Sequence, residues 1–514
     1  MKTGGAGRKY DVVIIGSGLA GLVCGSILSK EGKKVCIIEK NEQLGGSLQT
    51  FRREGVTFDT GVHYIGGLDK GQNLYQFFNY LGIMDRLELQ RMDPEGFDVV
   101  LFKDDDMQYP YGMGYENFIR VLSERFPNDR EAIVAYCDEL RRICDNFPLY
   151  NLRLGEFYND TNIFKRSIKQ FLEELTPNQK LRSVLGGTNL LYAGIGDKTP
   201  LYVHALVLNS YIESSWKCTQ GSDQISNLIA KGIKAMGGDI FRKKKVTKIH
   251  VEDGEAQYVE MEDGSRIFAD TFISNVNPAR TLEMTDTEKL RKAYRSRIQS
   301  LENSISVFVL YATMKPGAWK YQNRNYYYFD ENDVWKCADY TEQTWPYTYA
   351  MFECVPHSQN EYAEAITIMS YMRFEEVQKW AGTFNTTVKE SDRGGDYASF
   401  KKAKAEKLLD TVAIKFPEIR NQIHSYYTSS PLSYRDYIGN DDGNMYGVIK
   451  NFNDPLKSFI SPKTKVPNLL LTGQNVNLHG VLGVTVSAVL TCGMILGKDY
   501  LLKKIISANA GLNL

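Results

Sequence analysis

The start of the chain alternates between short apolar runs and turns. Residues 10–15 (YDVVII) are apolar and mostly β-branched, which predicts a strand buried between helical layers. Apolar positions then follow a helical spacing from Leu19 to Leu28, and a second β-branched run at residues 33–38 ends at Glu39. This order predicts a parallel unit of strand, helix and strand.

A glycine pattern of the form GxGxxG joins the first strand to the helix, at Gly16, Gly18 and Gly21. The first glycine permits a tight turn, the second lets the backbone approach a pyrophosphate, and the third lets the helix pack closely on the strand. The helix N-terminus offers unpaired N–H groups to the phosphates. Glu39 would accept hydrogen bonds from ribose hydroxyls. The unit therefore predicts a dinucleotide site, for either NAD or FAD.

A second glycine turn lies near the C-terminus. Residues 466–474 (VPNLLLTGQ) predict a strand that opens at a proline and closes on a glycine turn. Residues 480–497 predict a helix whose first residues are small, so that its N–H groups can approach a flavin.

The middle of the chain predicts a sheet. Residues 304–312 and 365–372 have the composition of strands, and aromatic residues gather at 326–329 and 345–352. Such alternating aromatics are more often ordinary core than the lining of a ligand tunnel, and both interpretations stay open.

A polar stretch follows this sheet. Residues 376–403 lack apolar periodicity and are expected to contain a surface loop, and residues 405–416 predict an amphipathic helix. We expect Lys401, Lys402 and Lys404 to lie on the solvent-exposed face of that helix.

Length and charge limit the possible functions. A chain of 514 residues exceeds the usual size of one hydrophobic core, so two or more domains are expected. The chain has 62 basic residues (Lys and Arg) and 62 acidic residues (Asp and Glu), so its formal net charge is zero. No nucleic-acid partner is therefore predicted. The basic run at residues 242–245 is interpreted as a solvated strand edge without a binding role.

The eight cysteines are scattered without CxxC spacing, which favours reduced thiols in a cytoplasmic protein. The six histidines form no HExxH or His/Cys pattern, so no metal is predicted. No window offers the roughly 20 uninterrupted apolar residues of a spanning helix. Any membrane contact is therefore expected to be peripheral.

Several segments carry a resemblance to a known family. After the first glycine motif, Glu39-Lys40 leads to Gly45-Gly46-Ser47, and residues 58–66 read FDTGVHYIG. Residues 431–434 (PLSY) and 471–474 (LTGQ) follow in order. Together these segments resemble the phytoene desaturase, carotenoid isomerase and retinol saturase superfamily of FAD enzymes, and FDTGVHYIG is especially similar to the retinol saturases.

The resemblance implies an α/β fold with a discontinuous, Rossmann-like FAD-binding domain of the glutathione-reductase type. Its three parts would lie at residues 1–75, 215–285 and 440–514. A substrate domain at residues 76–214 and 286–439 would be built on a mixed or antiparallel sheet plus helices.

The resemblance also implies a set of cofactor-binding residues. Val246 would meet the adenine through its backbone. The full set expected to bind FAD is Gly16, Gly18, Leu19, Ala20, Gly21, Glu39, Lys40, Gly45, Gly46, Ser47, Gly61, Val62, His63, Val246, Gly473, Gln474, Gly483 and Val484. Ser47-Leu48 replaces the cysteines that often follow the glycine pair in retinol saturases, and residues 475–479 match less closely. These departures leave the substrate and the bond acted upon open.

The leading hypothesis is a saturase, in which reduced FAD passes a hydride to one end of a C=C bond and a proton reaches the other. The substrate would be a retinoid, carotenoid or related lipid, which favours an apolar channel reached from a membrane surface. His63 and Tyr64 are the candidates for steering the proton, with His479 as a further one. Alternatively, His63 only packs or hydrogen-bonds near the flavin.

Two other functions stay open: desaturation or cis–trans isomerisation at the same site, and a nonenzymatic module that binds nucleotide or lipid. The sequence holds no second strand–GxGxxG–helix unit, so no separate NAD(P)H domain is expected. The electron donor and the oligomeric state are not determined.

Overall fold

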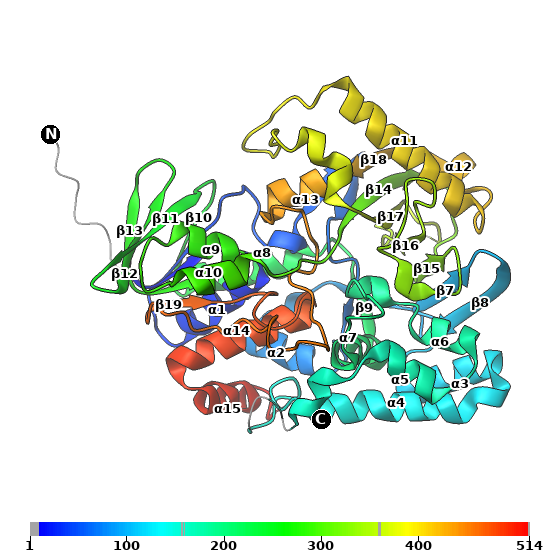
Figure 1. Ribbon diagram of the computed structural model, residues 1–514, viewed down its shortest axis with the longest axis horizontal. Coiled ribbons are helices and arrows are strands. Elements are labelled where there is room, and N and C mark those ends of the chain that lie inside the picture. Colours follow the sequence, from blue (N-terminus) through cyan, green and yellow to red (C-terminus); the bar gives the residue numbers. More distant parts are fainter. Residues whose placement is uncertain (1–9, 156–157, 159, 358–360, 512–514) are drawn as a thin grey trace.

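The computed structural model describes residues 10–155, 158, 160–357 and 361–511. Two large sheets dominate it, one at the left of Figure 1 and one at the right, and helices flank both. This arrangement confirms the predicted α/β fold with a Rossmann-like sheet and a second, sheet-based part.

The first sheet has seven strands in the described part of the chain, and its centre is parallel. Strand β1 lies between β2 and β13, and β19 pairs with the other edge of β13. Strand β12 pairs antiparallel with β13, and β11 pairs antiparallel with β12 to form a hairpin. The bounds are β1 (Tyr10–Ile15), β2 (Val35–Ile38), β10 (Asp239–Phe241), β11 (Val246–Glu252), β12 (Glu255–Met261), β13 (Arg266–Ser274) and β19 (Leu469–Leu471).

Strand β1 is apolar from Val12 to Ile15 because both faces of the strand are covered there. Val12 and Ile14 join a hydrophobic cluster with helices α1, α8 and α14, whereas Val13 and Ile15 join one with the hairpin and α9. Strand side chains alternate between faces, so each face receives every second residue. These helices are α1 (Leu19–Lys30), α8 (Asp223–Ala235), α9 (Pro278–Met284) and α14 (Gly480–Leu496).

The second sheet also has seven described strands, in the order β18-β14-β17-β16-β15-β7-β8. Its neighbours pair antiparallel except β15 and β7, so the sheet is mixed. Because β7 and β8 precede the others by about 200 residues, two separate stretches of chain build this one sheet. The bounds are β7 (Asp98–Phe102), β8 (Asp105–Tyr111), β14 (Ser306–Met314), β15 (Asn325–Phe329), β16 (Thr348–Glu353), β17 (Ala365–Met372) and β18 (Ile423–Ser429).

The aromatic residues of this sheet are core residues. Tyr326 and Tyr328 pack in a cluster that includes helix α11, whereas Tyr327 and Phe329 pack in the cluster on the other face. All four are buried, and none lines the large cavity described below. Of the two interpretations of the aromatic stretch, ordinary core is therefore the one that the structure supports for β15.

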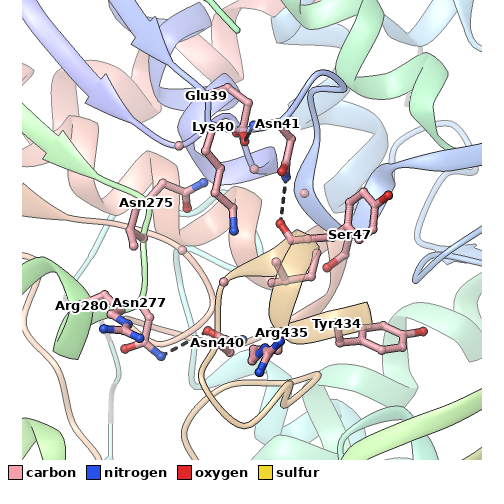
Figure 2. Close-up of a pocket in the computed structure, with 18 of the residues that line it drawn as sticks. Glu39, Lys40, Asn41, Ser47, Asn275, Asn277, Arg280, Tyr434, Arg435 and Asn440 are labelled. Carbon is pink, nitrogen blue, oxygen red and sulfur yellow. Dashed lines mark hydrogen bonds between the residues drawn. The ribbon is translucent and has the colours of Figure 1, made fainter. Parts of the chain in front are cut away.

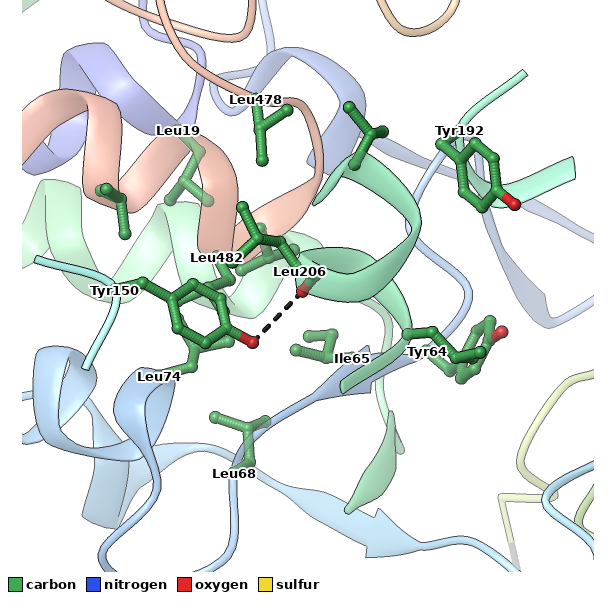
Figure 3. Packing of buried hydrophobic residues seen from close by; sticks show 14 of the residues in the cluster. Leu19, Tyr64, Ile65, Leu68, Leu74, Tyr150, Tyr192, Leu206, Leu478 and Leu482 are labelled. Carbon is green, nitrogen blue, oxygen red and sulfur yellow. Dashed lines mark hydrogen bonds between the residues drawn. The ribbon is translucent and has the colours of Figure 1, made fainter. Parts of the chain in front are cut away.

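One hydrophobic cluster contains residues of both sheets and of several helices. Leu19 of α1, Leu206 of α7 and Leu482 of α14 belong to this cluster, which Figure 3 shows from close by. Burial of such side chains contributes about 1.5–3 kcal/mol each. The remaining elements are α2 (Asn73–Leu81), α3 (Tyr115–Arg125), α4 (Arg130–Asp145), α5 (Ile168–Leu175), α6 (Gln179–Leu185), α7 (Leu201–Glu213), α10 (Lys292–Gln299), α11 (Gly394–Ala413), α12 (Ile419–Gln422), α13 (Pro431–Ile438), α15 (Lys498–Ala508), β3 (Thr50–Arg53), β4 (Val56–Asp59), β5 (Ile65–Gly66), β6 (Leu89–Arg91) and β9 (Ser215–Cys218).

The surface loop expected within residues 376–403 lies at residues 381–393, and helix α11 begins after it, at Gly394. The prediction that Lys404 lies on the solvent-exposed face is wrong: its side chain is 10% exposed, forms an ion pair with Glu376 and lies 4.5 Å from the centre of the Trp345 ring. At this position the helix packs against the segments that carry Glu376 and Trp345, and the sequence of the helix alone does not show that contact.

No helix in the described ranges has the length and apolarity needed to span a bilayer.

Candidate active site

A cavity of about 1150 Å³ lies at the carboxyl ends of the parallel strands. Ile15, Ile38 and Asn275, at or just after the ends of β1, β2 and β13, form part of its wall. Helix α13 and residues 381–384 contribute to the opposite part of the lining. Ligands of open α/β sheets bind at this edge, because strand ends and helix N-termini converge there.

The first glycine motif forms a cradle in this wall. Gly16 has a φ of +90°, which strongly favours glycine, and Gly18 is the N-cap of α1 without any side-chain cap. A Cβ on Gly46 would lie 3.3 Å from the Cα of Gly18, so the two turns are in close contact. With no acidic residue in the first turn of α1, the N–H groups of the helix suit a pyrophosphate.

A second helix N-terminus also meets the cavity, at the start of α14. Gly480 has a φ of +77°, and His479 as N-cap makes no side-chain cap hydrogen bond. Gln474 and Val484 line the cavity. Two helix starts without side-chain caps therefore meet one cavity, which favours an anionic ligand.

Glu39 is buried at the end of β2 and lines the cavity (Figure 2). Its Oε2 accepts hydrogen bonds from the N–H of Ser17 at 2.9 Å and from the hydroxyl of Ser17 at 2.7 Å, and its Oε1 accepts one from the N–H of Asn41 at 2.8 Å. A carboxylate offers about four acceptor positions, so it can also accept from a ribose hydroxyl. The next residue, Lys40, donates to the carbonyl oxygen of Asp436 at 2.9 Å, and burial lowers the pKa of Lys40.

Most of the residues expected to bind FAD line this one cavity. They are Gly16, Gly18, Leu19, Ala20, Glu39, Lys40, Gly45, Gly46, Ser47, Gly61, Val62, Val246, Gly473, Gln474 and Val484. Gly21, Gly483 and His63 are not in its wall. Gly21 and Gly483 allow close packing instead. A Cβ on Gly21 would lie 2.2 Å from the carbonyl oxygen of Gly16, and a Cβ on Gly483 would lie 2.7 Å from the carbonyl oxygen of Leu478.

Several cavity residues were not foreseen from the sequence. Lys243, Lys244 and Lys245, which were given no binding role, lie in the wall near Val246, and each forms an ion pair with a glutamate or aspartate. Figure 2 shows further polar residues of the wall, among them Asn277, Arg280, Arg435 and Asn440. No local motif marks these positions, because they meet the cavity only through tertiary folding.

His63 lies behind the cavity wall. Its ring stacks on Phe352 with the centroids 4.4 Å apart and the planes 9° apart, and its buried Nε2 has no hydrogen-bond partner among the described residues. Burial, with the nearby Lys217 ammonium, lowers the pKa of His63 to about 3. The imidazole is therefore neutral near pH 7.

Tyr64 is also buried away from the cavity and belongs to the hydrophobic cluster of Figure 3. Its hydroxyl donates to Oδ2 of Asp98 at 2.8 Å and lies 2.6 Å from the hydroxyl of Tyr327. Burial raises the pKa of Asp98 to about 7, although hydrogen bonds from Asn325 and Tyr64 oppose the shift. The three side chains form a buried network that includes a carboxyl able to hold a proton near neutral pH.

Comparison with protein families decides the class of this molecule. Residues 19–385 match the model of a family described as flavin containing amine oxidoreductase. The chain belongs to this family. It is therefore an FAD-dependent oxidoreductase, and the glycine cradle, the two helix starts and Glu39 fit that cofactor. The prediction of FAD over NAD is confirmed.

Curated relatives extend over nearly the whole flavoprotein. All-trans-retinol 13,14-reductase of Rattus norvegicus is 24% identical, with 96% of this chain and 86% of the relative covered. Prolycopene isomerase of Daucus carota is 23% identical, with 86% of this chain and 72% of the relative covered. Both belong to the superfamily that the sequence motifs resemble, so that prediction is confirmed as well.

Among solved structures, putrescine oxidase bound to putrescine has the same fold. The TM-score is 0.62 at 15% sequence identity, and the alignment covers 97% of this chain and 99% of the oxidase.

Proposed function

We propose that this flavoprotein reduces a carbon–carbon double bond in an apolar polyene with a retinoid- or carotenoid-like skeleton. The observation that carries the proposal is that the cavity has apolar side chains in its wall beside the glycine turns. Leu48, Val62, Met445, Tyr446 and Val481 are among them. Apolar surface of this kind favours a hydrocarbon chain over a charged amine. The named activity of the rat relative supports the same substrate class.

Each part of the site is assigned to a part of FAD. The turn at Gly16 and Gly18 with the start of α1 would bind the pyrophosphate, Glu39 the ribose, and Val246 the adenine. The flavin would lie against Gly45, Gly46, Ser47, Gly61, Val62, Gly473, Gln474 and the start of α14. Bound FAD supplies hydride transfer, and the protein supplies position and exclusion of water.

The proton would come from the network behind Val62. Asp98 is fully buried and holds a proton up to about pH 7, and Tyr64 links it to Tyr327. We assign His63 a positioning role, because the stacking of its ring on Phe352 fixes the adjacent backbone of Val62. Tyr64→Phe is expected to lower kcat while FAD content is retained, and an unchanged kcat would contradict this role.

Product mass tests the reaction. The purified protein is examined by visible absorption, its released cofactor is identified, and the anaerobically reduced holoenzyme is incubated with all-trans-retinol. Reduction adds two hydrogens to the retinoid. Unchanged retinol with the reduced enzyme, together with loss of two hydrogens when the oxidised holoenzyme is used, would contradict a reductase. A colourless protein that takes up no added FAD would contradict the whole assignment and favour the nonenzymatic module.

Isomerisation is the second candidate, favoured by the similarity to prolycopene isomerase. It would leave the substrate mass unchanged but alter its chromatographic retention. An apolar substrate would be drawn from a membrane surface, so peripheral association is part of the proposal. Flotation of the holoenzyme with phosphatidylcholine vesicles tests it, and recovery of all protein in the vesicle-free fraction would contradict it.

A further inference from the structure

The side chain of Asn275 differs from the other asparagine side chains in the wall of the large cavity. The others form hydrogen bonds within the protein, namely Asn41, Asn277, Asn440, Asn444 and Asn475. Asn275 also lines the cavity (Figure 2), but its amide forms no hydrogen bond with any residue in the described ranges. An amide group carries two donors and an acceptor, so this one is available to a ligand.

The amide of Asn275 lies between two glycine turns. Its Nδ2 occupies the space that a Cβ on Gly18 would need and would lie 3.2 Å from a Cβ on Gly21, so it borders the first turn of α1. Its Oδ1 instead occupies the space that a Cβ on Gly473 would need. The donor end of the amide therefore meets the start of α1, and the acceptor end meets the C-terminal turn.

The start of α1 presents donors as well. The N–H of Leu22 forms the first hydrogen bond of the helix, with the carbonyl oxygen of Gly18 at 3.1 Å, so the N–H groups before it have no acceptor within the helix. Nδ2 of Asn275 thus lies beside N–H groups and not beside an acceptor. Donors gathered at one place suit an anion, because an anion accepts from all of them.

The C-terminal turn provides no partner for the acceptor end of the amide. The N–H of Gly473 donates to Oγ of Ser487 at 3.1 Å, and the same Oγ donates to the carbonyl oxygen of Gly473 at 3.0 Å. Ser487 therefore satisfies both backbone groups of this glycine. Oδ1 of Asn275 is left to accept from a hydroxyl of a ligand on the side of the cavity assigned to the flavin.

We propose that Asn275 binds FAD at the junction between its pyrophosphate and its ribityl chain, with Nδ2 donating to a phosphate oxygen and Oδ1 accepting from a ribityl hydroxyl. At this junction an anion adjoins a chain of hydroxyl groups, so one amide can meet both. The inference rests on the proposed position of the pyrophosphate at Gly16 and Gly18. It adds a residue that the cofactor-binding set expected from the sequence does not include.

Two substitutions that keep the size of the side chain separate hydrogen bonding from packing. Asn275→Leu fills the space between the turns but removes donor and acceptor, whereas Asn275→Asp keeps an acceptor and places an anion beside the phosphates. The Kd of FAD is measured by quenching of flavin fluorescence on the full chain after removal of flavin. We expect Asn275→Leu to raise this Kd about tenfold and Asn275→Asp to raise it about 100-fold, because like charges repel.

ADP and adenosine locate the contact, since ADP carries the pyrophosphate of FAD and adenosine carries no phosphate. Asn275→Asp should raise the Kd of ADP at least about tenfold and leave that of adenosine unchanged, measured by titration calorimetry. Unchanged adenosine binding also shows that the variant is folded. Asn128→Asp is the matched control, because Asn128 is exposed between α3 and α4 and does not line the cavity, and it should leave all three dissociation constants unchanged.

Several results would overturn the proposal. Wild-type FAD affinity in Asn275→Asp, or a larger loss in Asn275→Leu than in Asn275→Asp, contradicts a donor to the phosphates. Equal losses of ADP and adenosine affinity contradict it too, since they show a general structural effect. Gly18→Ala separates the two proposals: unchanged ADP affinity there contradicts the position of the pyrophosphate itself, whereas a loss there with none in Asn275→Asp contradicts only the role of Asn275.

Discussion

The side-chain amide of Asn275, just after β13, fills the space beside Gly18 at the start of α1: a Cβ on Gly18 would lie 2.6 Å from its Nδ2. The same amide meets the C-terminal turn, where a Cβ on Gly473 would lie 2.7 Å from its Oδ1. One side chain thus sets the distance between two glycine turns that come from opposite ends of the sequence. Both turns line the cavity.

The third glycine of the motif is expected to be the least replaceable. A Cβ on Gly21 would lie 2.2 Å from the backbone oxygen of Gly16, and backbone cannot move aside as a side-chain tip can. We expect Gly21→Ala to lower the free energy of unfolding by about 1–3 kcal/mol and to reduce bound FAD. Thermal unfolding and flavin absorbance per protein measure both effects.

Gly232 provides the control for this substitution, because a Cβ there would meet nothing within 4 Å and the residue lies within α8. Gly232→Ala should keep or slightly raise stability. Wild-type FAD content and unfolding midpoint in Gly21→Ala would show that the close packing is unimportant.

The ion pair of Lys404 and Glu376 is expected to matter for stability. Removing Lys404 leaves Glu376 without its cation and removes the contact with the Trp345 ring. We expect Lys404→Ala to cost about 2 kcal/mol in urea unfolding. Lys402→Ala, at an exposed position of the same helix, should change stability by less than about 0.5 kcal/mol. Equal effects of the two variants would show that the ion pair and the ring contact of Lys404 do not contribute to stability.

Asp98 should make stability depend on pH. Its pKa is about 7 in the folded protein against 3.8 as the ordinary value, so the folded state binds the extra proton between these limits. Stability from this group is therefore complete below about pH 4 and is lost as the pH rises to 7, by roughly 1.4 kcal/mol per pH unit. Above pH 7 no further loss is expected.

Asp98→Asn removes this titration while the side chain keeps an oxygen that can accept from Tyr64. The variant should gain about 3 kcal/mol over wild type between pH 5 and pH 8, measured by urea unfolding. Asp59 and Glu213 also have pKa values raised by burial, but they titrate in both proteins and cancel in the difference. Parallel stability curves for the two proteins would refute the assignment to Asp98.

A buried ion cluster fixes the loop that contributes to the cavity wall. Asp436 is fully buried and accepts from Arg393, from Nε of Arg435 at 2.8 Å, and from the backbone N–H of Asn385 at 2.8 Å. Removing its carboxylate leaves the guanidinium groups of Arg393 and Arg435, whose side chains are 8% and 14% exposed, without their anionic partner. We expect Asp436→Ala to cost about 3–5 kcal/mol and to speed FAD dissociation and proteolysis between residues 381 and 393.

Asp410 pairs with Arg420 at the surface, where its side chain is 73% exposed, and serves as the comparison. Asp410→Ala should cost less than about 1 kcal/mol and leave FAD dissociation unchanged. Unaltered proteolysis and FAD release in Asp436→Ala would mean that the loop is held by other contacts.

The sequence by itself determined the parts of the site that depend on local backbone. The strand at residues 10–15, the turn at Gly16 and Gly18 and the acid at Glu39 lie close together in the chain, so their spacing specifies their geometry. Glycine at these positions reflects a positive φ or a missing Cβ, and both leave a recognisable pattern of residue types. The dinucleotide site could be inferred for this reason, whereas FAD and the full fold class were inferred from the family resemblance of further segments.

Only the tertiary structure decided which distant residues meet this local framework. It placed Lys243 and its neighbours in the cavity wall, buried Lys404, and brought Asn275 between Gly18 and Gly473. It also set His63 and Tyr64 behind the wall, although their motif was correctly recognised as part of the resemblance. Whether a side chain is buried, paired or free to meet a ligand depends on elements far away in the chain, and residue type and spacing carry no record of those contacts.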